Sequence, residues 1–270
     1  MSAEIFRREL SKPSDRIIVA YDDMEWPSIV ATAEEIGLYT GLGKTNSAHV
    51  RVGSDLAVYR LARAGQMTML DSKFHDTPPT VSRSVREATL SWSSLITVHA
   101  SGGPKMLEAA VQGAHEGRNQ LNDRFGKWPK ELFGHVLGIT VLTSLDAVDC
   151  ESIYGIPKED KDGIKKKVID FAHMAADAGL IGIVCSPLEA RAVRANSKFD
   201  SLLVVTPGLT PEFALQADDQ KRSTSVKQAA NDGVDMFVVG RAINQAGLYN
   251  MSRIEAVKAV AEEIKEGMEG

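Results

Sequence analysis

The chain has 270 residues, of which 43% are hydrophobic and 25% are charged, so it can fold around a sizeable core. Its net charge of −5 argues against a general nucleic-acid-binding protein, because such proteins are usually basic overall. No apolar run reaches the length of a membrane span, the N-terminal residues lack a signal sequence, and the two cysteines have neither metal-site nor disulfide spacing. These features predict a cytoplasmic protein with no bound metal and no membrane segment.

Short apolar runs alternate with helix-forming segments along most of the chain. The apolar runs predict strands at residues 16–22, 39–45, 66–70, 95–99, 135–142, 180–185, 202–205 and 235–239. The segments between and after them predict helices at residues 28–36, 56–64, 81–90, 106–114, 164–178, 188–195, 226–231 and 254–268. Residues 117–134 and 146–162 predict long surface connections with short helical turns.

The order strand then helix, repeated eight times, indicates a parallel sheet. The strands are continuous apolar runs, as expected when both faces of such a sheet are covered. Eight such units in a chain near the typical length of ~250 residues predict an α/β protein, a (β/α)8 TIM barrel that forms a single domain over residues 1–270. Residues 1–15 are then a short N-terminal extension. The alternative is a doubly wound open sheet, which usually has fewer strands.

The stretch LDSKFHDTPPT, residues 70–80, gathers charges where the third predicted strand ends. Asp71 and Lys73 are two positions apart and share a face of that strand, and Asp76 follows them. Alone, this triplet is most simply a solvated ion pair. In a barrel, however, the active site lies at the C-terminal ends of the strands. Other predicted strand ends carry the polar residues Asp22, Lys44, His99, Ser101, Thr143 and Ser144, so a pocket is expected there.

The loops after the seventh and eighth strands predict a phosphate site, because these loops commonly bind phosphate in such barrels. They carry Pro207-Gly208 and Gly240-Arg241. Glycine lets backbone N–H groups approach an anion, and arginine offers a planar fork for phosphate oxygens. Gln220 lies in the intervening loop, from which its amide can reach the same anion. The alternative for Gly240-Arg241 is a helix start with a surface arginine.

Five motifs, spread over nearly the whole chain, together resemble the orotidine 5′-phosphate decarboxylase family. They are, in order, DSKFHDTPPT (71–80), VHASGG (98–103), LTS (142–144), VTPG (205–208) and DDQKR (218–222). The first resembles the family's Asp-x-Lys-x-x-Asp signature. The resemblance implies that a homodimer converts orotidine 5′-phosphate to UMP, the last step of de novo pyrimidine nucleotide synthesis, without a cofactor.

The resemblance also implies roles for individual residues. Lys73 is implied as the acid that protonates C6 of the pyrimidine as CO2 leaves, with Asp71 beside the substrate carboxylate. Asp76 and Thr80 are implied to act in the partner's site, across a dimer interface. Lys44 is implied as a further catalytic residue that pairs with these carboxylates and with the ribose. The residues implied to bind the remaining parts of the substrate are Asp22 for the ribose, Thr143 or Ser144 for the pyrimidine, and Pro207, Gln220, Gly240 and Arg241 for the phosphate.

Three positions differ from the family pattern. The family's second-strand lysine often precedes Val-Gly, which here points to residues 51–53, but we assign Lys44 because it stands at the strand end. Pro79 replaces the family's usual asparagine. Thr210 stands where many bacterial members carry a phosphate-binding arginine, so this chain either makes fewer cationic contacts or uses the Lys221-Arg222 pair.

Three other functions remain open at this point. A Mg2+-dependent sugar-phosphate decarboxylase or aldolase shares the charge motif but lacks the FHD-Thr-Pro continuation seen here. A Schiff-base aldolase would use Lys73 as the nucleophile, although flanking carboxylates favour the charged form of an amine. A non-catalytic barrel would bind a phosphate ligand without turnover. His75 and His99 have the simpler explanation of structural residues.

Overall fold

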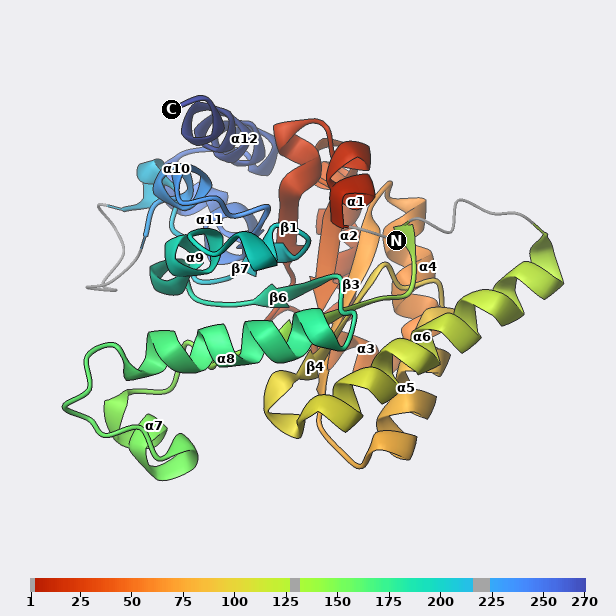
Figure 1. Ribbon diagram of the computed structural model, residues 1–270. Helices are drawn as coiled ribbons and strands as arrows, with labels where there is room; N and C mark the ends of the chain where they lie inside the picture. The colour runs from red at the N-terminus through yellow and green to blue at the C-terminus, as the bar shows by residue number, and fades with distance from the viewer. Residues whose placement is uncertain (1–2, 127–131, 216–223) are drawn as a thin grey trace.

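The computed structural model describes residues 3–126, 132–215 and 224–270. Eight parallel strands pair in chain order and close into a barrel, since β1 also pairs with β8 (Figure 1). The strands are β1 (Ile17–Ala20), β2 (Leu42–Thr45), β3 (Met67–Phe74), β4 (Leu95–His99), β5 (His135–Ile139), β6 (Gly182–Val184), β7 (Leu203–Thr206) and β8 (Met236–Val239). The single-domain (β/α)8 barrel expected from the sequence is confirmed.

Helices precede the first strand, connect the strands and follow the last strand, and most of them cover the outside of the barrel. They are α1 (Ala3–Glu9), α2 (Trp26–Ile36), α3 (Ser47–Val52), α4 (Ser54–Arg63), α5 (Pro78–Leu90), α6 (Pro104–Phe125), α7 (Ala147–Tyr154), α8 (Gly163–Asp177), α9 (Pro187–Arg194), α10 (Val226–Asn231), α11 (Arg241–Asn244) and α12 (Arg253–Glu269). A proline in the first turn starts α2, α5, α6 and α9, where its missing N–H costs no helical hydrogen bond. Among the described residues, no helix is both long and apolar enough to cross a membrane.

Side chains of each strand alternate between two apolar layers. In β1, Ile17 belongs to the layer between strands and helices, whereas Ile18 belongs to the layer inside the barrel. The inner layer also contains Ala3, Phe6 and Leu10 from the start of the chain. Phe6 is fully buried, and its ring meets that of His135 at the first residue of β5. The first helix therefore closes the N-terminal end of the barrel.

Partly buried charges hold α1 in this position. Nε of Arg7 donates to Oδ1 of Asp235 at 2.7 Å, and Nη2 of Arg7 donates to the carbonyl oxygen of Leu202 at 2.6 Å. Arg194 of α9 pairs with the same carboxylate, which stands directly before β8. Because this end of the barrel is filled, the opposite end is left for a pocket.

The helix α6 is longer than the sequence pattern predicted. The expected helix ended at residue 114 and residues 117–134 were expected to be a surface connection, but α6 runs to Phe125 (Figure 1). Gly113 and Gly117 do not end this helix. A Cβ at either position would collide with α5, at the backbone of Ser82 or the side chain of Thr89. The two glycines instead let α5 and α6 approach closely.

Several other boundaries differ from the prediction. β3 continues past residue 70 to Phe74, so Asp71 and Lys73 lie within the strand and not after it. Their polar side chains are tolerated because they stand at the rim of the barrel. β5 ends at Ile139 and not at residue 142. The short helices α1, α3 and α11 had no counterpart in the predicted elements, and α7 occupies the first part of the expected connection 146–162.

Candidate active site

A pocket of about 540 Å3 opens at the C-terminal end of the barrel. Its lining comes from β1, β2, β3, β5, β6 and β8, and from segments that follow strands, including the one after β7. The predicted site residues that line it are Asp22, Lys44, Asp71, Lys73, Thr143, Pro207, Gly240 and Arg241. The structure thus brings most of the predicted residues into one cavity, from strands far apart in the sequence.

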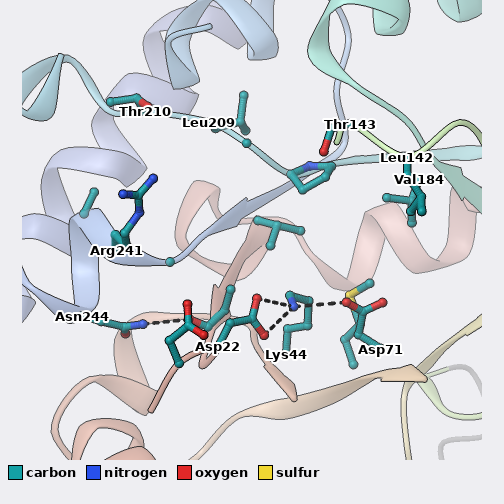
Figure 2. A pocket seen from close by; sticks show the side chains of 18 of the residues that line it. Asp22, Lys44, Asp71, Leu142, Thr143, Val184, Leu209, Thr210, Arg241 and Asn244 are labelled. Atoms are coloured by element: carbon teal, nitrogen blue, oxygen red, sulfur yellow. Dashed lines mark hydrogen bonds and ion pairs between the residues drawn. The ribbon is translucent and has the colours of Figure 1, made fainter. Parts of the chain in front are cut away.

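Four charged side chains of alternating sign form a row in this pocket. Nζ of Lys44 donates to both oxygens of Asp22, at 2.9 and 2.8 Å, and to Oδ2 of Asp71 at 3.1 Å (Figure 2). Nζ of Lys73 donates to the same Oδ2 of Asp71 at 2.6 Å. The inner pair is nearly enclosed, with the Lys44 side chain 8% exposed and that of Asp71 7% exposed. Asp22 and Lys73 are 47% and 31% exposed, so the outer members can meet a ligand.

The charge state of Asp71 follows from its neighbours. Burial by itself raises the pKa of this carboxyl, but the nearby ammonium groups of Lys44 and Lys73 outweigh burial, so the pKa lies below the ordinary value of 3.8. The carboxylate is therefore ionised at neutral pH and stabilises both ammonium groups in turn. A ligand in this pocket meets a cation that is held in place by a fixed anion.

The backbone of β3 is irregular where it carries these charges. Its pairing with β4 shifts register between Leu70 and Phe74, and Lys73 has a φ of 48°, in the left-handed region that non-glycine residues avoid. The irregularity leaves the Lys73 ammonium in contact with Asp71. The contact expected from the two-residue spacing is present, although the strand is not regular there.

Thr97 of β4 belongs to the same cluster and was not among the predicted residues. Its Oγ1 accepts the backbone N–H of Lys73 at 2.9 Å and donates to Oδ1 of Asp71 at 3.0 Å. The side chain is fully buried. The signal in the sequence was a hydroxyl group inside an otherwise apolar strand, LITVH, at residues 95–99.

Arg241 lies across the pocket from Lys44 and Asp71 (Figure 2). It is the first residue of α11 and follows Gly240, which stands directly after β8. Thr210 lines the same side of the pocket (Figure 2). The Lys221-Arg222 pair, considered as a substitute for an arginine at this position, lies outside the described residues. This side of the pocket therefore carries a guanidinium group, separate from the charged row.

Asn244 fixes the distance between the two sides of the pocket. Its Nδ2 donates to the carbonyl oxygen of Ala20 at 2.7 Å (Figure 2). Ala20 is the last residue of β1, and Asn244 is the last residue of the short helix that begins at Arg241. This hydrogen bond ties the helix that carries the guanidinium to the strand that leads to Asp22.

Of the predicted residues that the structure describes, Asp76, Thr80 and Ser144 do not line the pocket. Asp76 is exposed and its Oδ1 accepts the N–H of Thr77 at 2.5 Å, while the hydroxyls of Thr77 and Thr80 lie 3.1 Å apart. Ser144 follows Thr143 but is not part of the lining. Gln220 lies outside the described residues. The chain by itself therefore leaves Asp76 and Thr80 away from its own charged row.

Three residues that invited a site assignment have other contacts. Arg51 lies outside the pocket and pairs with Glu25 at 2.7 Å, with both side chains exposed. The rings of His75 and His99 lie 5.4 Å apart, also outside the pocket. Burial, together with His75 and Lys73, lowers the pKa of His99, so this imidazole is neutral at neutral pH. Lys44, and not Arg51, stands in the charged row.

A closed parallel barrel with charged groups gathered at the C-terminal ends of its strands is the architecture of a (β/α)8-barrel enzyme. Residues 15–253 match the model of the orotidine 5′-phosphate decarboxylase / HUMPS family. The chain therefore belongs to the orotidine 5′-phosphate decarboxylase / HUMPS family, and the resemblance seen in its motifs is confirmed. As a member of this family it is a carbon–carbon lyase.

Similar proteins cover nearly the whole chain. The orotidine 5′-phosphate decarboxylase of Heliobacterium modesticaldum is 35% identical over 254 residues, which are 94% of this chain and 97% of that protein. The enzyme of the same name from Anaeromyxobacter sp. (strain K) is 38% identical over 237 residues, 87% of this chain and 93% of the relative.

Solved structures show the same fold. The crystal structure of orotidine 5′-phosphate decarboxylase from Lactobacillus acidophilus has a TM-score of 0.70 and 26% identity, covering 92% of this chain and 98% of that chain. An uncharacterized conserved protein from Geobacillus kaustophilus has a TM-score of 0.71 at 23% identity, covering 92% and 99% of the two chains, and shares the fold.

Proposed function

We propose that this chain decarboxylates orotidine 5′-phosphate to UMP in the cytoplasm, with Lys73 as the proton donor to C6 of the pyrimidine. The observation that carries the proposal is the ammonium of Lys73, 2.6 Å from Asp71 and partly open to the pocket. A lysine held beside a carboxylate keeps its proton at neutral pH and can deliver it to carbon. Family membership supplies the substrate class.

The charged row suits the charge that develops in this reaction. Loss of CO2 leaves a carbanion on the ring, and a fixed cation at Lys73 stabilises that charge as it forms. Asp71 lies beside the substrate carboxylate in this scheme, so its repulsion is relieved when CO2 departs. We give this repulsion a minor role, because ground-state stress is a contested source of rate.

The other pocket residues bind the parts of the nucleotide that do not react. Arg241, with Gly240 and Pro207, holds the phosphate, and Gln220 joins them. Asp22 and Lys44 hold the ribose, and Thr143 or Ser144 contacts the pyrimidine. The phosphate lies far from the bond that breaks, so its binding energy can be used to orient the ring over Lys73.

The proposal includes a homodimer in which Asp76 and Thr80 complete the partner's site. The support is their position in the single chain, where both lie outside the pocket. Mixing Lys73→Ala protomers with Asp76→Ala protomers tests this arrangement. If Asp76 acts in trans, half of the dimers are mixed and each has one intact site, so about a quarter of wild-type activity returns. No recovery on mixing would mean that Asp76 does not act across an interface.

An absorbance assay with orotidine 5′-phosphate, without added metal, tests the reaction itself. Lys73→Ala is expected to lower kcat by about 10²–10⁴-fold or more, the usual contribution of a positioned acid. Lys158→Ala, at an exposed lysine between α7 and α8, is the matched control. Alkylation of Lys73→Cys with 2-bromoethylamine restores an ammonium group and should restore turnover. Near-normal turnover by Lys73→Ala would refute the proposed role.

The same preparation separates the competing functions. A Mg2+-dependent sugar-phosphate enzyme loses activity in EDTA, whereas the proposed reaction is unaffected. A Schiff-base aldolase is trapped on Lys73 by borohydride in the presence of its substrate. The carboxylate 2.6 Å from Lys73 disfavours that nucleophile, because it stabilises the ammonium form. UMP binding without any turnover of orotidine 5′-phosphate would indicate a binding protein.

A further inference from the structure

The side chain between Asp71 and Lys73 makes a contact outside the pocket. Oγ of Ser72 lies 3.1 Å from Nε2 of His49, a residue of α3 that is only 8% exposed. Neither Ser72 nor His49 lines the pocket. The contact joins the strand that carries both charged residues to a helix on the outside of the barrel.

The second ring nitrogen of His49 determines the direction of this hydrogen bond. Nδ1 lies 3.0 Å from the carbonyl oxygen of Thr45, and a carbonyl can only accept, so Nδ1 carries the hydrogen. Burial lowers the pKa of His49, so the ring is neutral at neutral pH and Nε2 keeps its lone pair. Ser72 therefore donates its hydroxyl hydrogen to Nε2.

Asn46, between β2 and α3, holds the preceding residue of β3 as well. Nδ2 of Asn46 donates to the carbonyl oxygen of Asp71 at 3.0 Å. Asn46 and His49, at the start of α3 and within it, thus contact two successive residues of β3, at the backbone of Asp71 and the side chain of Ser72. The backbone N–H of Lys73 is held separately by Thr97.

Lys73 needs this support because of its backbone conformation. A φ of 48° is unfavourable at a residue with a Cβ and persists only where surrounding contacts hold it. Relaxation toward extended backbone would change the direction of the Lys73 side chain, whose ammonium now lies 2.6 Å from Asp71. The hydroxyl of Ser72, one residue earlier, is well placed to prevent that relaxation.

We propose that the Ser72–His49 hydrogen bond is a positioning contact that holds the β3 irregularity, so that Nζ of Lys73 points at the substrate carbon. This inference rests on the proposed role of Lys73 as proton donor. Neither residue touches the substrate in this scheme. Loss of the contact slows proton transfer and leaves substrate binding intact, because the phosphate and ribose contacts come from other strands.

Paired substitutions test the contact by kinetics. Ser72→Ala removes the donor, and His49→Asn keeps a donor for the Thr45 carbonyl but is too short to reach Ser72. Each should lower kcat by about five- to tenfold, the effect of one hydrogen bond, with KM within about twofold of wild type. The double variant should be no slower than either single variant, because both break one contact. Ser72→Thr keeps the hydroxyl and should restore kcat.

If the Ser72–His49 contact had only a structural role, the variants would change stability and not kcat. Ser72→Ala would then lower the melting temperature while kcat per folded site stayed at the wild-type value. That result, or losses that multiply in the double variant, would overturn the positioning role.

A crystal structure of the Ser72→Ala variant gives a second test that does not depend on the reaction. The proposal requires that, in the variant, Nζ of Lys73 moves away from Asp71 or occupies more than one position. A single Lys73 conformer with the contact still at 2.6 Å would contradict it. Wild-type protein that fails to turn over orotidine 5′-phosphate would contradict the proposed function alone, and the crystal structure would still decide the role of Ser72.

Discussion

Thr97 donates its hydroxyl hydrogen to Oδ1 of Asp71 over 3.0 Å. The same oxygen of Thr97 accepts the backbone N–H of Lys73, so one buried hydroxyl satisfies a carboxylate and a strained backbone together. The two lysines occupy Oδ2 of Asp71, which leaves Oδ1 to this hydroxyl. The orientation of the carboxylate is thereby fixed at both oxygens.

Thr97→Val tests this arrangement, because valine has nearly the same shape and no hydroxyl. Both partners then lose their hydrogen bond in a buried place, which costs about 1–3 kcal/mol of stability. We expect the variant to unfold at lower denaturant concentration and kcat to fall about tenfold or more, since the carboxylate can turn. Thr97→Ser keeps the hydroxyl and serves as the control. Equal kcat for the valine and serine variants would contradict the role given to the hydroxyl.

The hydrogen bond from Asn244 to the carbonyl of Ala20 predicts a different kinetic change. Asn244→Ala releases the short helix that carries Arg241, so the guanidinium is no longer held at a fixed distance from the charged row. We expect KM and the dissociation constant of UMP to rise about three- to tenfold, with a smaller change in kcat. Calorimetric titration with UMP measures the binding change. Lys73→Ala should show the reverse pattern, with kcat lost and UMP binding largely kept.

Glu263 of α12 predicts a pH dependence of stability. Its Oε1 accepts the backbone N–H of Glu212 at 2.8 Å, and burial raises its pKa from 4.5 to about 7. The folded state therefore holds this proton over a range in which the unfolded chain has lost it. The contribution of this group is fully present below about pH 4.5 and is lost as the pH rises through about 7.

Glu263→Gln removes the loss of stability at high pH, because the amide is neutral and its oxygen still accepts the backbone N–H of Glu212. The variant should be more stable than wild type at about pH 8 by on the order of 1 kcal/mol, after allowance for solvent screening, and this advantage should vanish near pH 4.5. Urea unfolding at the two pH values measures it. Glu266→Gln is the control, because a hydrogen bond from Lys227 lowers the pKa of that carboxylate and its loss brings no gain. An equal change in the free energy of unfolding at both pH values would contradict a raised pKa at Glu263.

The closed N-terminal end of the barrel predicts a stability change without a catalytic one. Phe6 is fully buried against the inner layer, so Phe6→Ala should cost about 3–5 kcal/mol of unfolding free energy. At a temperature where the variant is folded, kcat and KM should match wild type, because the pocket is at the other end. Arg8→Ala, at an exposed position of the same helix, should change neither quantity. A large change in kcat for folded Phe6→Ala would show coupling between the two ends.

Most strands were predictable because they are short apolar runs, which are typical of a parallel sheet covered on both faces, whereas β2, with the sequence LGKT, carries a glycine and a lysine. The length of α6 was not predictable from the sequence. Gly113 and Gly117 are favourable in that helix only because α5 lies against them, and this proximity is a property of the folded chain. Local propensity cannot distinguish a glycine that ends a helix from one that allows a neighbour to approach.

The candidate site was predictable to the extent that it depends on spacing along one strand. The spacing of Asp71 and Lys73 predicted a contact, and the contact is present, although the backbone at Lys73 departs from a regular strand. Thr97 and Asn244 act across strands, and their partners depend on the register between β3 and β4 and on the closure of β8 against β1. The local sequence pattern determines neither the strand register nor the closure of the barrel, so these contacts could be identified only from the structure.

The position of α1 has a consequence for the order in which the molecule is assembled. This helix precedes all eight strands in the chain, yet Arg7 pairs with a residue 228 positions later. Until synthesis reaches β8, the ring of Phe6 has no finished cavity to enter and remains available to chaperones or to proteases. The first helix can therefore dock only after the last strand is in place. A protease that cleaves before Leu10 would then cut unfinished barrels and spare complete ones.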